Sequence, residues 1–263
     1  MKSFKSKKPL VSIITPNYNG EKFLEKTIKS VLAQTSKNFE YLIYDACSTD
    51  SSHKIIKKYR RKIDFVSIKK DKGHYHALHK GIKNCNGKII LWINSDDLLH
   101  KDAVSNVIKI FSSDNKLEWI SGINGYIKGK KKFSGIPYIY PNFIISSGLA
   151  HHNYWGFIQQ ESISFKKKLF LRSGGFNSRY SNAGDYYLWK NFSKFAPLKT
   201  FCIKIGYFRT WKGQNSNVEG KKYFKDTGYD KNIVSFRFIR LIISIFFLPY
   251  LYFRTAYKLK KNT

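Results

Sequence analysis

Short apolar segments rich in β-branched and aromatic residues alternate with helix-like segments along the first half of this chain. The first two apolar segments are 10–15 (LVSIIT) and 39–44 (FEYLIY), and the segment 21–34 between them has a helical pattern. This order predicts a strand, a crossover helix and a parallel strand. The alternation continues with a helix ending near residue 61, strands at 64–68, 88–93 and 117–121, and a helix at 101–111. We therefore expect an α/β fold with a Rossmann-like, mostly parallel sheet and helices on both faces.

The chain carries a large excess of positive charge. Lys and Arg number 48 against 17 Asp and Glu, which gives a formal net charge of +31. Such a protein is expected to work beside an anionic partner, and nucleic acid, anionic lipid and phosphorylated substrates all qualify. A basic nucleic-acid-binding protein is therefore one alternative. The lysines are spread along the chain and no recognition motif accompanies them, so we expect no nucleic acid partner.

The three cysteines argue for a reducing compartment. Cys47, Cys85 and Cys202 are odd in number, far apart and without CxxC spacing, which argues against a disulfide framework and against a zinc site. The basic N-terminal residues 1–8 lead into a short strand-like segment and not into the apolar stretch of a signal peptide. We expect a protein that is not exported.

Polar and acidic residues follow three of the predicted strands, at the point where each strand ends. They are residues 15–19 with Glu21, Asp45 with residues 48–50, and residues 94–97. In open parallel sheets ligands bind beyond the carboxyl ends of the strands. A carboxylate cluster there repels itself unless a cation lies between its members, and Mg²⁺ or Mn²⁺ prefers carboxylate and diphosphate oxygens. We expect a divalent cation with a nucleotide diphosphate, although Ser95-Asp96-Asp97 is also an ordinary helix N-terminus.

Four motifs in a fixed order make a family resemblance specific. They read TPNYN at 15–19, YDACSTD at 44–50, DKGHYHALHKGI at 71–82 and GKIILWINSDD at 87–97. Over about residues 10–215 the chain resembles family 2 glycosyltransferases of the GT-A fold, in particular those that build bacterial surface polysaccharides. The resemblance implies an enzyme that moves a sugar from a nucleotide-diphosphate sugar to an acceptor hydroxyl, with a divalent cation, in polysaccharide or lipopolysaccharide synthesis.

The resemblance also implies roles for individual residues on the donor side. Those that border the nucleobase and ribose are Pro16, Asn17, Tyr18 and Glu21. Asp45 hydrogen-bonds the base, Asn94 belongs to the nucleotide-sugar site, and Asp96 faces the ribose or the metal. Asp97 is the first choice for a metal ligand, because a carboxylate there can bridge through the cation to the diphosphate.

On the acceptor side, residues 183–189 (AGDYYLW) are similar to the block in which the family carries its catalytic base, and Asp185 matches that base. An inverting transfer needs a carboxylate on the far side of the anomeric carbon from the leaving diphosphate, where it takes the acceptor proton. Asp185 is also the N-cap candidate of a helix at 186–195. The two roles are compatible, since the helix dipole keeps an N-terminal carboxylate ionised.

The sequence departs from the family pattern at several positions. His76 and His79 stand where Asp and Asn are usual, and they either contact the donor or face solvent. Lys80 is a phosphate contact or a surface lysine. In residues 208–216 (FRTWKGQNS), Trp211 replaces a usual histidine, which puts metal dependence in doubt, and Arg209 is a diphosphate clamp or a structural ion pair. These departures leave a catalytically inactive relative as an alternative.

The last segment differs in composition from the rest. We expect a catalytic domain at 1–232, with a nucleotide-sugar half at about 10–121 and an acceptor half at 122–232, and a tail at 233–263.

The apolar run 241–253 in the tail is shorter than the ~20 residues of a spanning helix and is framed by Arg and Lys. We expect it to lie in an anionic membrane interface or to form a re-entrant hairpin, with a buried core helix as the alternative. The protein would then be cytoplasmic and peripheral at the inner face of the cell membrane, where a lipid-linked glycan is a natural acceptor.

Overall fold

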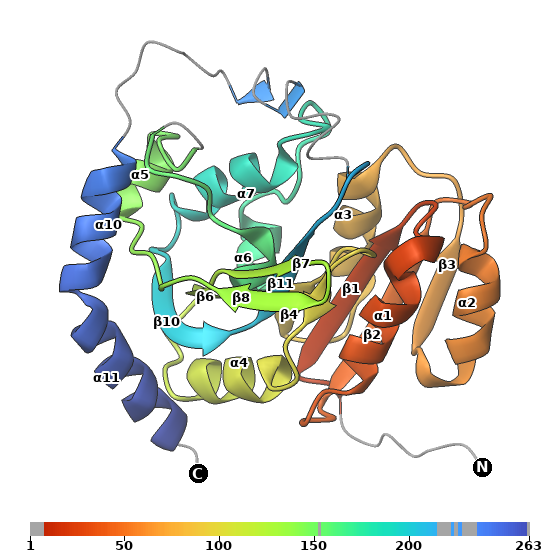
Figure 1. Ribbon diagram of the computed structural model, residues 1–263, viewed down its shortest axis with the longest axis horizontal. Coiled ribbons are helices and arrows are strands. Elements are labelled where there is room, and N and C mark those ends of the chain that lie inside the picture. Colours follow the sequence, from red (N-terminus) through yellow and green to blue (C-terminus); the bar gives the residue numbers. More distant parts are fainter. Residues whose placement is uncertain (1–7, 152–153, 215–221, 224–225, 228–235, 262–263) are drawn as a thin grey trace.

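A seven-stranded sheet forms the centre of the protein (Figure 1). The computed structural model describes residues 8–151, 154–214, 222–223, 226–227 and 236–261. The strands are β1 (Val11–Asn17), β2 (Phe39–Asp45), β3 (Phe65–Ile68), β4 (Ile89–Trp92), β6 (Trp119–Ile123), β9 (Ile163–Lys166) and β10 (Lys199–Lys204). Their order is β10-β6-β9-β4-β1-β2-β3. Only β9 runs antiparallel to its neighbours, β4 and β6, so the predicted mostly parallel sheet is confirmed.

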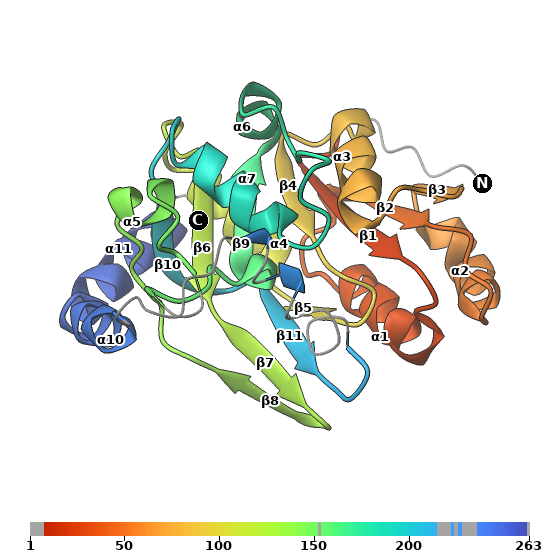
Figure 2. The same cartoon turned by 90° about the horizontal axis from the view of Figure 1, so that it is seen from above.

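Helices cover both faces of this sheet, as predicted (Figure 2). One face packs against α1 (Glu21–Leu32), α2 (Ser52–Tyr59) and α4 (Ala103–Ser112). The other face packs against α3 (His74–Asn84), α5 (Asn142–Ser146), α6 (Lys167–Arg172) and α7 (Gly184–Phe192). In α1, Leu24, Ile28 and Val31 are fully buried because their spacing places them on one side of the helix. Two separate apolar cores result, one on each face.

A second, smaller sheet lies beside the carboxyl ends of the central strands. It contains β5 (Leu98–Leu99), β11 (Gly206–Thr210), β7 (Gly125–Lys128) and β8 (Lys131–Ser134), in that order. Strand β11 pairs antiparallel with β5 and parallel with β7. Because β5 begins directly after Asp97, this pairing brings the segment around Arg209 against the end of β4.

Strands β7 and β8 form a hairpin that leads into a mostly irregular segment. In the described residues between 135 and 159 the one regular element is the short helix α5. The antiparallel strand β9 was not anticipated. It inserts between β4 and β6 and carries the polypeptide from the loops back into the central sheet.

The tail forms two helices, α10 (Arg237–Phe246) and α11 (Leu248–Lys260), along the β10 side of the molecule (Figure 1). In the described residues no single helix is both long and apolar enough to cross a membrane. The pair α10 and α11 reaches that length and composition only together, across a bend of 56°. Residues 233–235 and 262–263 of the predicted tail lie outside the described residues.

Candidate functional site

A hydrogen-bond network centred on Asp45 ties together the carboxyl ends of β1 and β2. Asp45 is almost fully buried, and it accepts hydrogen bonds from Asn17 Nδ2 at 2.6 Å and from Ser48 N at 2.8 Å and Ser48 Oγ at 2.6 Å. His53 Nε2 lies 2.8 Å from its Oδ1. Burial works to raise the pKa of Asp45, but these hydrogen bonds outweigh it and hold the pKa below its usual value. Most acceptor positions of the carboxylate are thus occupied within the fold, and its hydrogen bond to a nucleobase stays a prediction.

Glu21 also makes contacts within the fold. Its backbone N donates to Asp50 Oδ2 at 2.8 Å, and its Oε2 accepts from Ser51 N at 2.9 Å, so the starts of α1 and α2 cap each other. Pro16 is buried in β1, whereas the Tyr18 side chain is 64% exposed at the strand end. Of the residues predicted to border the base, Tyr18 therefore offers the most accessible surface.

Asp97 lies inside the protein. Its side chain is 0% exposed, its Oδ1 accepts from Arg209 N at 2.7 Å, and its Oδ2 accepts from Asn94 Nδ2 at 3.2 Å. Burial above all, and then the charges of Glu161 and Asp96, raise the pKa of Asp97 well above its usual value. Burial likewise raises the pKa of Glu161 to about 7. Asp97 is thus buried and hydrogen-bonded within the fold, and its role as the metal ligand stays a prediction.

Asp96 is the carboxylate of the pair that solvent reaches. Its Oδ2 accepts a hydrogen bond of 2.9 Å from Trp211 Nε1, so the tryptophan that replaces the usual histidine holds this side chain. In the described residues no three His, Cys, Asp or Glu side chains are grouped to hold a metal. One partly exposed carboxylate fits a Mg²⁺ or Mn²⁺ ion whose other ligands are diphosphate oxygens and water. The donor set therefore fits a cation that arrives with the nucleotide.

Arg209 is built into the same edge. Its guanidinium is buried, with Nε 2.6 Å from the backbone oxygen of Asp96 and Cζ 4.5 Å from the ring centre of Phe23. Arg209 thus contacts Asp96 within the fold, and its Nη2 group has no hydrogen-bond partner in the described residues. A diphosphate contact through Nη2 stays a prediction. Asn215 and Ser216 of the same motif lie outside the described residues.

Asp185 lies in the first turn of α7 and is anchored through one oxygen. Its Oδ1 accepts hydrogen bonds from Tyr75 Oη at 3.0 Å and from Tyr186 N at 2.8 Å. Burial raises the pKa of Asp185 above its usual value, and these hydrogen bonds oppose the rise only in part. No hydrogen bond in the described residues involves Oδ2. Asp185 is thus held through Oδ1, and its role as the catalytic base stays a prediction.

Two further residues, Tyr75 and Glu161, lie in the site although the sequence analysis assigned neither of them a role. Burial and the charges of Asp185 and Glu161 raise the pKa of Tyr75. Glu161 lies at the end of β4, where its Oε1 accepts a hydrogen bond of 3.4 Å from Asn94 Nδ2. Gly184 permits the close approach of Tyr75 to α7, because a Cβ there would lie 2.6 Å from the Tyr75 ring. Tyr75 sits within the predicted 71–82 motif, but only the fold reveals its partner.

Aromatic side chains stand beside Asp185, and we call His151, Phe157, Tyr186 and Tyr223 the aromatic wall. Ring centres are 5.8 Å apart for His151 and Tyr186, and 5.4 Å apart for Phe157 and Tyr223. The charge of Asp185 contributes, after burial, to raising the pKa of Tyr223. Aromatic faces with polar edges of this kind suit the apolar faces and hydroxyls of a sugar.

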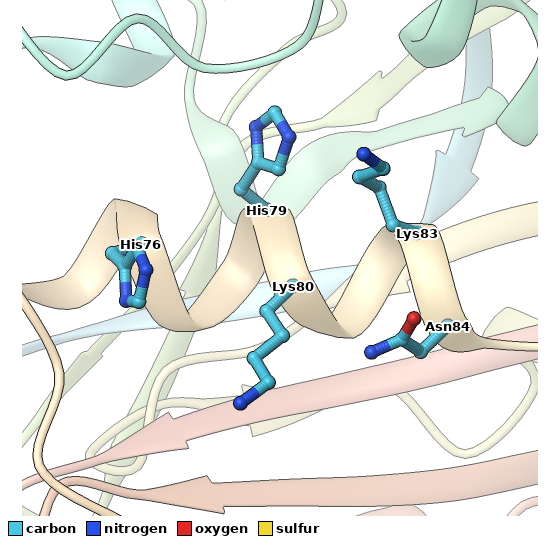
Figure 3. Close-up of a pocket in the computed structure, with 5 residues that line it drawn as sticks. All are labelled: His76, His79, Lys80, Lys83 and Asn84. Atoms are coloured by element: carbon cyan, nitrogen blue, oxygen red, sulfur yellow. The ribbon is translucent and has the colours of Figure 1, made fainter.

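Lys80 does not join these groups. It projects from α3 into a shallow pocket of about 250 Å³ that it shares with His76, His79, Lys83 and Asn84 (Figure 3). Lys80 and His76 are exposed, and the ring of His79 packs edge-on against Phe170 of α6 at 5.4 Å. For His76 and Lys80 this arrangement favours the surface alternative, and for His79 it favours a packing role.

Comparisons with known proteins decide the family. The family model described as glycosyl transferase family 2 matches residues 12–176. The chain belongs to glycosyl transferase family 2. This family 2 glycosyltransferase is 29% identical over 97% of its length to an uncharacterized glycosyltransferase of Rickettsia felis, and 29% identical over 80% of its length to chondroitin synthase of Escherichia coli. The matches cover 43% and 30% of those two relatives, so the chain spans less than half the length of each.

Solved structures share the fold of this family 2 glycosyltransferase. S. aureus TarS in complex with UDP-GlcNAc superposes with a TM-score of 0.66 at 18% identity, over 82% of this chain and 64% of that chain. The mannosyltransferase PcManGT from Pyrobaculum calidifontis in complex with GDP-Man and Mn²⁺ gives a TM-score of 0.62 at 17% identity, over 96% of this chain and 74% of that chain. The predicted GT-A fold is thereby confirmed.

Proposed function

We propose that this chain transfers a sugar from a nucleoside-diphosphate sugar to an acceptor hydroxyl, with inversion at the anomeric carbon. The observation that carries the proposal is the anchored carboxylate of Asp185, whose Oδ1 is held by Tyr75 of α3 and by the backbone N of Tyr186. A donor held at the strand ends and a base on α7 would then flank one reacting carbon.

Asp185 would act as the general base. As the acceptor oxygen forms its bond to the anomeric carbon, the bond from that carbon to the diphosphate breaks, and the acceptor proton passes to Asp185. Tyr75 and the backbone of Tyr186 fix Oδ1, which leaves Oδ2 to take the proton. The raised pKa makes this carboxylate a stronger base than an exposed aspartate.

The donor would lie along the ends of β1, β2 and β4. Tyr18 supplies an exposed ring for the base, and Asn17, Asp45 and Glu21 keep the supporting loops in place. The complexes of TarS with UDP-GlcNAc and of PcManGT with GDP-Man support a nucleoside-diphosphate sugar as donor. Asn94 and Asp96 would face the donor from β4, with Arg209 Nη2 as a further contact.

Asp96 would be the protein ligand of a Mn²⁺ or Mg²⁺ ion, in preference to the buried Asp97. When bound, such an ion offsets the negative charge of the departing diphosphate. The Mn²⁺ complex of PcManGT supports a cation in a protein of this fold.

The acceptor would be a glycan. The resemblance to chondroitin synthase supports a sugar acceptor, and Phe157 of the aromatic wall, which is 37% exposed, offers it an accessible ring. Cell-surface polysaccharide or lipopolysaccharide synthesis, at the cytoplasmic face of the membrane, is the setting that we propose.

Donor binding can be tested by thermal shift with UDP-, GDP- and dTDP-sugars in the presence of Mn²⁺. One nucleotide class is expected to stabilise the protein, by about 2.7 kcal/mol at a hundredfold excess over its dissociation constant. Asp96→Asn should weaken this stabilisation, whereas Asp185→Asn should retain it, because Asp185 is placed on the acceptor side. A protein that none of the three classes stabilises would contradict the proposal and favour an inactive relative.

A further inference from the structure

Helices α10 and α11 pack on the rest of the protein through polar side chains. Ser244 and Thr255 are buried, and Arg240 is 9% exposed. Ser244 Oγ accepts a hydrogen bond of 3.1 Å from Ile139 N, and Thr255 Oγ1 accepts one of 2.7 Å from Cys202 N. The Arg240 guanidinium lies 3.9 Å from the ring centre of Tyr138. The inner side of the helix pair combines these polar contacts with apolar ones, since Leu251 is 2% exposed and Ile243 and Leu259 pack against the apolar cores.

Most large apolar side chains of the same helices face outward. A surface helix normally does the reverse and buries its apolar side. More than half of the exposed large hydrophobic side chains in the described residues lie between Phe238 and Tyr257, in the two helices and at Phe247 between them. Six of them follow one another at intervals of three or four residues, and we call this set the docking face: Phe238, Ile242, Phe246, Tyr250, Phe253 and Tyr257. Phe246 is 80% exposed and Phe253 is 72% exposed.

The positive charge of residues 236–261 favours an anionic partner for the docking face. Residues 236–261 contain no Asp or Glu, and Lys260 and Lys261 lie exposed at the end of α11. The whole chain carries a net charge of +31. A set of exposed Phe, Tyr and Ile side chains within an acid-free basic segment complements an anionic bilayer, where rings enter the headgroup region and Lys or Arg meets lipid phosphates. A second copy of the chain would bring two strongly positive molecules together.

We propose that the docking face of α10 and α11 binds the surface of an anionic lipid bilayer. The bend of 56° between the helices suits a pair that lies along the interface. Each helix carries three of the six side chains, so both helices have rings to insert into the interface.

The docking helices are connected to the segment that carries the aromatic wall. Arg240 Nη1 donates to Tyr140 Oη at 3.4 Å, and Tyr140 Oη donates to the backbone oxygen of Phe157. Gly156 makes this contact possible, because a Cβ there would lie 2.1 Å from Arg240 Nη1. Docking would then hold the acceptor side of the site near the lipid surface, which fits a lipid-linked glycan. That consequence rests on the proposed function, whereas bilayer binding does not.

The test is flotation of the full chain with vesicles of phosphatidylcholine mixed with phosphatidylglycerol, and with vesicles of phosphatidylcholine alone. The wild type should float with the mixed vesicles and bind the neutral ones more weakly. The double variant Phe246→Glu with Phe253→Glu should lose binding by about tenfold or more. The control is Phe65→Glu with Phe133→Glu, which alters exposed aromatic residues on β3 and β8 and changes the net charge equally. It should float like the wild type.

Equal flotation of the two double variants, or no flotation of the wild type, would overturn the proposal. A third result would also overturn it: light scattering shows that the wild type is a dimer, this dimer binds no vesicles, and the docking-face variant is a monomer. The docking face would then bind a second copy of the chain. Thermal melts check that each variant folds. Nucleotide-sugar binding in solution is measured in parallel, so a failure of docking can be told apart from a failure of the proposed transfer.

Discussion

The hydroxyl of Tyr75 lies 3.0 Å from Oδ1 of Asp185 and joins the start of α3 to the first turn of α7. These two helices come from parts of the chain more than a hundred residues apart. The contact fixes Oδ1 of the proposed base on the side of α3. Several outcomes of substitution depend on it.

Replacement of Asp185 by Asn should lower turnover by about 10²- to 10⁴-fold, the range that general base catalysis contributes. Asn can still accept the hydrogen bonds of Tyr75 and Tyr186, so the fold and the binding of nucleotide should persist. Released nucleoside diphosphate measures the first effect, and calorimetric titration with the nucleotide measures the second. A variant with wild-type turnover would remove Asp185 from the mechanism.

Tyr75→Phe should change the pH profile in a defined direction. The Tyr75 hydroxyl lowers the pKa of Asp185, so its loss should raise that pKa further. A base works only when deprotonated, so activity is lost as the pH falls through its pKa, and the acid limb of kcat/KM should move to higher pH. Tyr59→Phe, which removes a distant hydroxyl bonded to Glu25, is the control and should leave the limb in place. A shift to lower pH would contradict the contact.

If Asp96 holds the cation, variants of Asp96 and Asp97 should differ in the Mn²⁺ concentration that they require for activity. Asp96→Asn removes the partly exposed carboxylate and should raise the Mn²⁺ concentration for half-maximal activity about tenfold or more. Asp97→Asn retains an oxygen for Arg209 N and should leave this concentration near the wild-type value. Trp211→His adds a nitrogen ligand beside Asp96 and should lower it. The opposite order for Asp96 and Asp97 would restore Asp97 as the ligand.

Asp45→Ala should reduce the free energy of unfolding by about 1–3 kcal/mol or more, because it leaves buried donors of Asn17 and Ser48 without an acceptor. The folded-state pKa of Asp45 is lowered, so its contribution is present above the ordinary pKa of 3.8 and is lost as the pH falls through the folded value. Urea titrations at neutral pH and in acid should therefore show a difference that shrinks in acid. Asp71→Ala, at a partly exposed loop position where the carboxylate accepts from Gly73 N, is the control and should cost less.

The sequence was sufficient for the order of strands and helices in the first half, because the β1, α1 and β2 segments each carry an apolar pattern with one clear period. It could not predict the place of β9, since four residues that run antiparallel between β4 and β6 have no local signal of their pairing. In the site, the motif at 94–97 located the acidic edge correctly. Which aspartate is exposed depended on Arg209 and Trp211, which are more than a hundred residues away in the chain.

In the tail and at Tyr75, too, contacts between residues far apart in the chain decide what the local sequence could not. Composition identified α10 and α11 as apolar helices with basic residues nearby, but the outward direction of their apolar side follows from contacts of Arg240, Ser244 and Thr255 with distant segments. Tyr75 gave no signal, because a tyrosine at the start of a helix has many ordinary roles. The division into a nucleotide-sugar half, an acceptor half and a tail stays a prediction.

The central claim is that Asp185 takes the acceptor proton while a nucleotide leaves from the edge that carries Asp96. The most direct measurement is nucleoside diphosphate release from UDP-, GDP- and dTDP-sugars with Mn²⁺, for the wild type and for Asp185→Asn under identical conditions. The account predicts release from one donor class by the wild type, and a loss of about a hundredfold or more in the variant with nucleotide binding intact. Equal release by both proteins, or none from any donor by the wild type, would contradict it.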